Sequence, residues 1–285
     1  NMSDIFFSEM GIPEPKYNLN VGSFSHGKQT ALMLEGIESI LKAENPDYLI
    51  VYGDTNSTVA GSLAASKIHI PVVHIEAGLR SFNKSMPEEL NRIMTDHAST
   101  LLFTPTVTGL ENLAKEGFQT ENLPPYHIDN PKIYHCGDIM LDNSIYFSEI
   151  ANQKSKVLEQ YNLKENQFIL CTVHRDSNTD VAQRLTAIFN ALQTISLNYH
   201  ETIFIPLHPR TLKKLPEMLP QSLLNDMKIN KNIIWTEPVS FFDMIKLEKS
   251  SKIIITDSGG VQKEAFFFNK PSLILRPETE WIEIV

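Results

Sequence analysis

Short apolar runs alternate with helix-like segments along almost the whole chain, and this alternation restricts the fold. Residues 48–54 (YLIVYGD) and 70–77 (IPVVHIEA) have the composition of buried strands, and the helix-like STVAGSLAASK lies between them. The same rhythm resumes at 167–174 (QFILCTVH) and continues to 271–277 (PSLILRP). Short strands separated by helices of this length predict parallel sheets with helices on both faces.

The chain has 285 residues, enough for two domains of ~150 residues each. The strand rhythm is interrupted at 148–165, where the sequence SEIANQKSKVLEQYNLKE is polar. We therefore expect an α/β protein with two Rossmann-like domains, 1–150 and 151–285, which face a cleft.

Composition excludes several classes of partner. A net charge of −9 argues against nucleic acid, which favours basic surfaces. No apolar run approaches the ~20 residues of a membrane helix, so we expect no membrane partner. Cys136 and Cys171 both lie in apolar, strand-like runs. We expect them to be buried thiols of a cytoplasmic protein, without a disulfide.

The two ends of the sequence look cut. The first ten residues, NMSDIFFSEM, lack the basic start and apolar core of a secretory signal, and the first residue is not Met. The first domain opens on a helix that leads into a strand, and no helix follows the last strand. We therefore expect a fragment of a longer cytoplasmic protein.

Charged, imidazole and glycine-rich groups gather where the predicted strands end. In open α/β sheets, ligands bind at the carboxyl ends of the strands. Five predicted strands end in such groups, and both halves of the chain contribute: Gly53-Asp54-Thr55, His74-Ile75-Glu76-Ala77-Gly78, His174-Arg175-Asp176, His208-Pro209-Arg210 and Thr256-Asp257-Ser258-Gly259-Gly260. This distribution predicts a site in an interdomain cleft.

The segment TDSGGVQKEA, residues 256–265, allows two interpretations. It can be a tight turn, since two glycines permit unusual backbone angles and Ser258 is a good helix cap. It can also be an anion site, because glycines let a ligand approach the backbone and a new helix presents free N–H groups. The segment alone does not separate them.

The three candidate acids also have structural interpretations. Asp54 can cap the helix that begins near Ser57. Glu88 lies in a first helical turn, where the helix dipole favours acids. Glu76 is harder to explain structurally, because it borders a buried strand where an unpaired charge is costly.

His174 and His208 can be hydrogen-bonded core histidines, but each is followed by an arginine within two residues. Two such pairs at strand ends favour anion binding. No metal is expected, because His69 and His74 have no Cys or acidic partners at ligand spacing. A nicotinamide cofactor and a serine hydrolase are also disfavoured, since G-x-G-x-x-G and G-x-S-x-G are absent.

Seven segments, taken together and in order, resemble one enzyme family. They are GDTNSTVAGSLAA, HIEAGLRS, MPEELNR, TVHR, PLHPR, TDSGGVQKEA and RPETEWIE. This set resembles the non-hydrolysing UDP-N-acetylglucosamine 2-epimerase family, and the similarity extends over residues 1–285.

The resemblance implies a GT-B-like architecture in which the C-terminal domain holds UDP. Ser258, Gly259 and Gly260 would receive the diphosphate at a helix N-terminus. Glu264 would hydrogen-bond the ribose hydroxyls. The remaining implied UDP contacts are Arg276 and His208 at the phosphates and the segment 238–244, with Met244, at the uracil.

The family reaction inverts carbon 2 of the sugar without a cofactor, through elimination of UDP to a glycal and its re-addition. Such chemistry needs a base, an acid on the other face of the sugar and stabilisation of the diphosphate. By resemblance, Asp54, Glu76 and Glu88 match family acids, and His174 matches a histidine needed for activity. Which carboxylate is acid and which is base stays open.

Departures from the family pattern leave alternatives. The opening strand with its basic loop and the C-terminal helices are not in this sequence, and TEWIE replaces the commoner TERPE. That variant suggests the branch acting on UDP-2,3-diacetamido-2,3-dideoxyglucuronate or a related acetamido sugar. A GT-B glycosyltransferase and a non-catalytic nucleotide-sugar binding protein are the other readings. The preferred one is a cytoplasmic, homodimeric epimerase for polysaccharide precursor synthesis.

Overall fold

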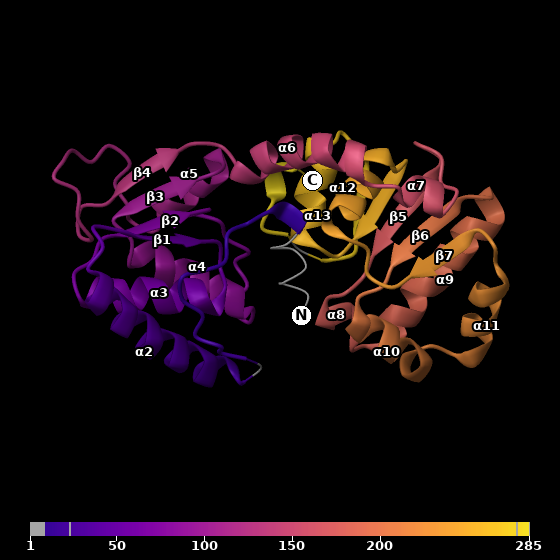
Figure 1. Ribbon diagram of the computed structural model, residues 1–285, viewed down its shortest axis with the longest axis horizontal. Coiled ribbons are helices and arrows are strands. Elements are labelled where there is room, and N and C mark those ends of the chain that lie inside the picture. Colours follow the sequence, from indigo (N-terminus) through magenta and orange to yellow (C-terminus); the bar gives the residue numbers. More distant parts are fainter. Residues whose placement is uncertain (1–8, 23, 278, 285) are drawn as a thin grey trace. The chain divides into compact units, whose positions relative to one another are not determined.

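The computed structural model describes residues 9–22, 24–277 and 279–284 (Figure 1). The chain divides into two compact units. The N-terminal unit is Glu14–Ile139; the C-terminal unit is Met140–Val285 together with the described residues up to Pro13. The boundary expected after residue 150 falls inside helix α6 (Ile139–Lys154). The polar segment 148–165 begins inside this helix, which packs through Phe147, Ile150 and Ala151.

The N-terminal unit contains a four-stranded parallel sheet in the order β1-β2-β3-β4. Its strands are β1 (Leu49–Tyr52), β2 (Val72–Ile75), β3 (Leu101–Thr104) and β4 (Lys132–His135). The helices of this unit are α2 (His26–Glu44), α3 (Asn56–Lys67), α4 (Pro87–His97) and α5 (Val107–Lys115).

Helices cover one face of this sheet, not both. Val51, Leu102 and Ile133 lie in register on one face and belong to apolar clusters with helix residues. On the other face, Ile50 and Tyr52 are exposed among the described residues. The prediction of two covered faces is therefore wrong for this unit. The strands follow one another in a single direction, and right-handed crossovers then place every connecting helix on the same side.

The C-terminal unit contains a five-stranded parallel sheet in the order β7-β6-β5-β8-β9. The strands are β5 (Phe168–Thr172), β6 (Thr202–Pro206), β7 (Ile233–Thr236), β8 (Ile253–Thr256) and β9 (Ser272–Ile274). The order reverses direction between β5 and β8. Such a reversal opens a crevice at the carboxyl ends of the two strands, where ligands bind in doubly wound folds.

The helices of the C-terminal unit lie on both faces of its sheet, as predicted. Besides α6 they are α7 (Val157–Gln160), α8 (Asp176–Thr179), α9 (Ala182–Tyr199), α10 (Pro209–Met218), α11 (Gln221–Ile229), α12 (Phe241–Ser250) and α13 (Gly259–Phe267), followed by a 3₁₀ turn, η1 (Ile282–Ile284). One apolar cluster joins α9 and α11 to one face, and a second joins α12 and α13 to the other.

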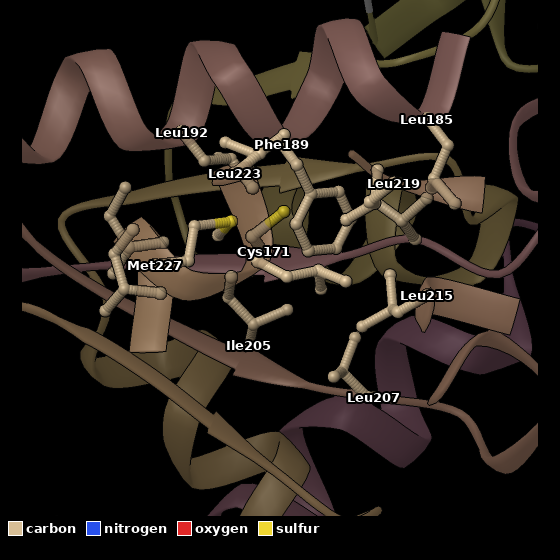
Figure 2. Packing of buried hydrophobic residues seen from close by; sticks show 14 of the residues in the cluster. Cys171, Leu185, Phe189, Leu192, Ile205, Leu207, Leu215, Leu219, Leu223 and Met227 are labelled. Carbon is tan, nitrogen blue, oxygen red and sulfur yellow. The ribbon is translucent and has the colours of Figure 1, made fainter. Parts of the chain in front are cut away.

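The larger core cluster is shown in Figure 2, where Phe189 of α9 points toward Cys171 of β5 and Leu192 and Leu185 lie to either side of Phe189. Cys171 is completely buried, as expected. Cys136 is exposed, so the expectation for that residue is wrong: β4 already ends at His135. Within the described residues, no helix is both long and apolar enough to cross a bilayer.

Candidate functional site

A buried aspartate organises the switch point of the C-terminal sheet. Asp257 follows β8, is 0% exposed, and accepts hydrogen bonds from the backbone N–H groups of His174 (3.1 Å) and Arg175 (3.0 Å). The Asn178 side chain adds a third at 3.0 Å. Burial alone would raise the pKa of Asp257, but the hydrogen bonds from His174 and Asn178 outweigh it and lower that pKa. The loop after β5 is thus fixed by a charged side chain.

The same aspartate orients the imidazole of His174. Nδ1 of His174 lies 3.2 Å from Oδ1 of Asp257, while the side chain remains 43% exposed. A carboxylate at Nδ1 fixes the tautomer and leaves Nε2 to face a ligand. The sequence analysis named His174 as a candidate, but it gave Asp257 no role beyond its place at a strand end.

A cavity of about 380 Å³ adjoins this loop. Five predicted residues line it together: His174, His208, Met244, Ser258 and Glu264. Much of the remaining wall is apolar, including Pro206, Pro238, Val239, Phe241 and Ile245. A mostly apolar pocket of this size with a few convergent polar groups is typical of small-molecule sites.

The N-terminus of α13 begins at the edge of this cavity. Ser258 is its N-cap, and the Ser258 hydroxyl accepts a hydrogen bond from the N–H of Val261 at 3.4 Å. Gly259 and Gly260 form the first turn, whose N–H groups have no acceptor within the helix. A Cβ at Gly259 would lie 2.9 Å from Oε1 of Glu280, so a side chain there would collide with its surroundings.

An unpaired cationic donor lies beside that helix end. Arg276 is only 5% exposed at its side chain, and its Nη2 is 2.7 Å from Oε2 of Glu280. Within the described part of the chain, Nη1 of Arg276 has no hydrogen-bond partner. A Cβ placed on Gly259 would lie 3.5 Å from this Nη1 atom and 3.6 Å from Nε1 of Trp281. A buried, unpaired N–H of this kind is costly unless an acceptor meets it. Sequence reasoning missed Trp281 as a neighbour of this site.

In the N-terminal unit, Asp54 forms an ion pair and does not cap α3. The α3 cap is Thr55, whose hydroxyl accepts from the N–H of Thr58. Oδ2 of Asp54 lies 2.5 Å from Nη2 of Arg92, and Nδ2 of Asn91 donates to the Asp54 carbonyl at 2.9 Å. The capping alternative for Asp54 is therefore wrong, and Arg92 is a partner that the sequence did not suggest.

The two adjacent acids at the start of α4 differ in environment. Glu89 is 1% exposed and accepts from the N–H groups of Ser81 (2.8 Å) and Phe82 (2.9 Å). Burial alone would raise its pKa, but hydrogen bonds from Ser81, Arg92 and Phe82 lower it. Glu88 is half-buried, and no hydrogen bond or ion pair engages it among the residues described. Glu88 lies one helical turn before Arg92, on the side that carries the Asp54 contacts.

Glu76 follows β2 in a strained backbone conformation. Its φ is 79°, in the left-handed region that non-glycine residues rarely adopt. Its N–H donates to the carbonyl of Phe103 at 3.1 Å, which holds the turn. Because Tyr52 pairs with Ile75, Asp54 and Glu76 leave adjacent strands at neighbouring positions. Strain of this kind concentrates at functional sites.

A buried charged network, which was not predicted from the sequence, lies behind these two strand ends. Nδ1 of His74 lies 2.6 Å from Oδ1 of Asp96, and Nε2 lies 2.9 Å from the Gly53 carbonyl. Both partners only accept hydrogen bonds, so both ring nitrogens donate and His74 is an imidazolium. Asp96 also pairs with Arg80 at 2.8 Å, and Arg80 pairs with Glu116 at 2.7 Å.

The pKa values follow from this network. Burial would lower the pKa of His74, but the bond to Asp96 raises it. Burial would raise the pKa of Asp96, but His74 and Arg80 lower it. The network thus holds fixed charges directly under Gly53, the residue before Asp54.

The predicted residues form two groups, one in each unit. In the C-terminal unit, four of the UDP residues and His174 line one cavity, while Gly259, Gly260 and Arg276 meet at the adjoining helix end. In the N-terminal unit, Asp54, Glu76 and Glu88 lie at two neighbouring strand ends and the start of α4. Across the described ranges, no group of three His, Cys, Asp or Glu residues could hold a metal ion.

Comparison with known proteins places the chain in a family. A model of the family described as UDP-N-acetylglucosamine 2-epimerase matches residues 1–285. A UDP-N-acetylglucosamine 2-epimerase homolog of Methanococcus maripaludis is 47% identical over 285 residues, 100% of this chain and 75% of the relative. UDP-2,3-diacetamido-2,3-dideoxy-D-glucuronate 2-epimerase of Pseudomonas aeruginosa is 45% identical, over 100% of this chain and 74% of the relative.

A solved structure agrees with this placement. The crystal structure of Methanocaldococcus jannaschii UDP-GlcNAc 2-epimerase, in complex with UDP-GlcNAc and UDP, matches with a TM-score of 0.84 and 42% identity. The match covers 98% of this chain and 74% of that one. This chain therefore belongs to the UDP-N-acetylglucosamine 2-epimerase family. The predicted class, two Rossmann-like α/β domains of GT-B-like type, is confirmed.

Proposed function

We propose that this chain converts UDP-N-acetylglucosamine into UDP-N-acetylmannosamine by inverting carbon 2, without a cofactor. The observation that carries the proposal is the buried, unpaired Nη1 of Arg276 beside Gly259 at the N-terminus of α13. Helix N-termini and arginine are preferred partners of phosphate. Membership of the epimerase family supplies the reaction.

The UDP part of the substrate is assigned to the C-terminal unit. The diphosphate contacts Ser258, Gly259, Gly260, Arg276 and His208. The apolar wall around Met244 and Phe241 suits a uracil ring, since the cavity is apolar there. Glu264, one turn into α13, accepts hydrogen bonds from the ribose hydroxyls.

The chemistry is assigned to the acids of the N-terminal unit and to His174. In elimination, a base removes the proton from carbon 2 while the bond from carbon 1 to the diphosphate breaks, giving UDP and a glycal. In re-addition, an acid delivers a proton to the opposite face of carbon 2 and the diphosphate returns to carbon 1. Asp54, Glu76 and Glu88 supply the acid and the base. His174, oriented by Asp257, stabilises the charge on the leaving diphosphate.

Proton NMR in deuterated water tests this function. With UDP-N-acetylglucosamine as substrate, we expect deuterium at carbon 2 and a manno epimer, because the removed proton exchanges with solvent before the glycal is reprotonated. A manno epimer without deuterium would contradict the elimination route. Bound UDP with neither exchange nor epimer would contradict this substrate.

A second substrate is favoured by one relative. The Pseudomonas aeruginosa protein, 45% identical, is named for UDP-2,3-diacetamido-2,3-dideoxy-D-glucuronate. The same NMR assay with that donor separates the two, because the better substrate has the larger kcat/KM. UDP release that depends on an added acceptor would indicate a glycosyltransferase instead. UDP binding with no turnover of either donor would indicate a binding protein.

The setting of the enzyme is also part of the proposal. The net charge of −9 and the nucleotide-sugar substrate suit a cytoplasmic enzyme that supplies precursors for polysaccharide synthesis. We propose that it acts as a homodimer. Light scattering coupled to size-exclusion chromatography tests this, and a monomeric mass at micromolar concentration would contradict it.

A further inference from the structure

Glu248 is a buried carboxyl that neither the family resemblance nor the proposed chemistry uses. It is 0% exposed near the end of α12, and neither of its oxygens has a hydrogen-bond partner in the described portion of the chain. It follows Met244 by four residues, so the two share one side of the helix. Both line the 380 Å³ cavity. An unpartnered carboxylate in such a place is costly, so Glu248 is held as a neutral acid.

The neighbour of Glu248 across the cavity wall is Glu264 of α13. Burial first, and then the charge of Glu264, raise the pKa of Glu248 well above its usual range. Burial raises the pKa of Glu264 to about 7, while Glu248 and the charge of Lys263 act to lower it. The other titratable groups around this cavity are His174 and His208, from the loops after β5 and β6. Near neutral pH the two carboxyls therefore hold one proton between them.

We propose that Glu248 is a positioning residue of the nucleotide site: its neutral carboxyl donates a hydrogen bond to the Glu264 carboxylate and turns the other oxygen of Glu264 toward the hydroxyl groups of a bound nucleotide sugar. The inference rests on the proposed function, because it takes this cavity as the nucleoside site. An ionised carboxylate accepts hydrogen bonds on both oxygens, so Glu264 can serve Glu248 and a ribose at once.

The sign of the pH dependence follows from the pair. Ribose hydroxyls donate to the ionised form of Glu264, so binding favours ionisation of a group whose pKa is about 7. Affinity therefore rises with pH, by up to about tenfold per unit, below the pKa of Glu264 and levels off above it. Below that pKa, binding releases a proton. Removing the donor on Glu248 moves the transition to higher pH, because Glu264 then ionises less readily.

Isothermal titration calorimetry with UDP-N-acetylglucosamine tests this. Each protein is titrated between about pH 6 and pH 8 in two buffers of different ionisation enthalpy, which gives the number of protons released. The ligand is a diphosphate diester whose charge is constant in this range. The Glu264→Gln variant measures any proton exchange that does not involve Glu264. We expect the wild type to release more protons than E264Q below pH 7.

Substitutions at Glu248 separate hydrogen bonding from packing. E248Q retains a donor, so its transition stays at the wild-type pH. E248L has none, so its transition moves up by about one unit and affinity at pH 7 falls about fivefold. In the E264Q background, the same E248L change alters affinity by less than about twofold, because its effect acts through Glu264.

Several outcomes would overturn the inference. A downward shift in E248L would mean that Glu248 is charged and repels Glu264. Equal weakening by E248L with and without Glu264 would mean that Glu248 is only part of the cavity wall. Binding and epimerisation with no Glu264-dependent proton release would remove this inference and leave the proposed function intact. No binding of UDP-N-acetylglucosamine by the wild type would remove both.

Discussion

Asp96 in the N-terminal unit and Glu248 in the C-terminal unit are both completely buried carboxyl groups, yet their surroundings are opposite. Asp96 meets a histidine, an arginine and the N–H of Gly78, and its pKa is lowered. No group in the described ranges donates a hydrogen bond to either oxygen of Glu248, and its pKa is raised. Burial is the same in both cases, so the partners decide the protonation state.

The contrast extends to the rest of each unit. The N-terminal unit holds its backbone turns with fixed charges: the Asp96 network lies under Gly53, and Glu89 binds the 81–82 turn. In the C-terminal unit, Nη1 of Arg276 is a hydrogen-bond donor without an acceptor in the described residues, and the protonated acid Glu248 lines the cavity. In the proposed function, the first arrangement positions acids for proton transfer and the second provides binding groups that a nucleotide completes.

The largest expected effect is on turnover, at Glu88, which makes no ion pair with the charged residues described around it. Glu88→Gln should lower kcat by about 10²–10⁴, the usual contribution of an acid–base group. Its stability should change little, because Glu88 is half-buried and makes no hydrogen bond or ion pair with the residues described. Glu35→Gln, an exposed change of the same chemistry on α2, is the control. A Glu88→Gln enzyme with full kcat would remove Glu88 from the mechanism.

The second effect compares the two buried carboxyls directly. Asp96→Asn should lower the free energy of unfolding by about 3–5 kcal/mol, because it leaves His74 and Arg80 charged and buried. Glu248→Gln should change it by less than about 1 kcal/mol, since a neutral acid is replaced by a neutral amide. Urea unfolding followed by circular dichroism measures both. Equal losses for the two variants would show that the contrast in partners does not matter for stability.

The third effect concerns the unpaired donor. Arg276→Met should weaken UDP binding by about 10–100-fold, the range for charge-assisted hydrogen bonds of ~1.5–3 kcal/mol. Arg184→Met, on an exposed part of α9, removes the same charge and is the control. Calorimetric titration with UDP measures both. Equal weakening by the two variants would mean that net charge, not the Arg276 contact, determines affinity.

The fourth effect is the pH dependence of stability in the N-terminal unit. The pKa of His74 is raised by folding, so its stabilisation is full below the unfolded value of ~6.5 and is lost as pH rises through the folded value. The free energy of unfolding should therefore fall as the pH rises above ~6.5 through the folded pKa of His74. His74→Gln should be less stable and should lack this part of the slope. An unchanged slope in that variant would show that His74 is neutral in the folded chain.

Much of the fold follows from local sequence, because apolar runs and glycine-rich turns mark strands and their ends. Four strands of the described residues, β1, β2, β5 and β9, lie within the predicted runs 48–54, 70–77, 167–174 and 271–277. The polar segment 148–165 does not coincide with the boundary between the two units, because helix α6 continues through residues 148–154. The sequence also did not predict that helices cover only one face of the N-terminal sheet among the described residues. That feature depends on the order of the strands, which is a nonlocal property.

The candidate site was partly predictable for the same reason. Residues at strand ends, such as His174 and Ser258, are found by position alone. Their partners are distant in sequence: Asp257 meets His174 across 83 residues, and Arg92 meets Asp54 across 38. Glu88 and Glu89 are adjacent and chemically identical, and only tertiary contacts show that Glu89 is engaged. No local sequence pattern predicts that Glu248 is buried, or that no group donates a hydrogen bond to its carboxyl oxygens.

The smallest expected stability effect resolves the two interpretations of the Ser-Gly-Gly turn. Ser258→Ala removes a helix cap and should cost about 0.5–2 kcal/mol of stability, whereas Ser258→Gly should cost only a few tenths, because glycine is tolerated at an N-cap. If Ser258 also binds the diphosphate, both variants lose the same hydroxyl donor and should weaken UDP binding by a similar factor, about 5–10-fold. Urea unfolding and calorimetric titration of the two variants separate the roles. Affinity that falls only in the alanine variant would mean that the serine acts on the ligand through the helix end alone, and unchanged affinity in both would leave capping as its sole function.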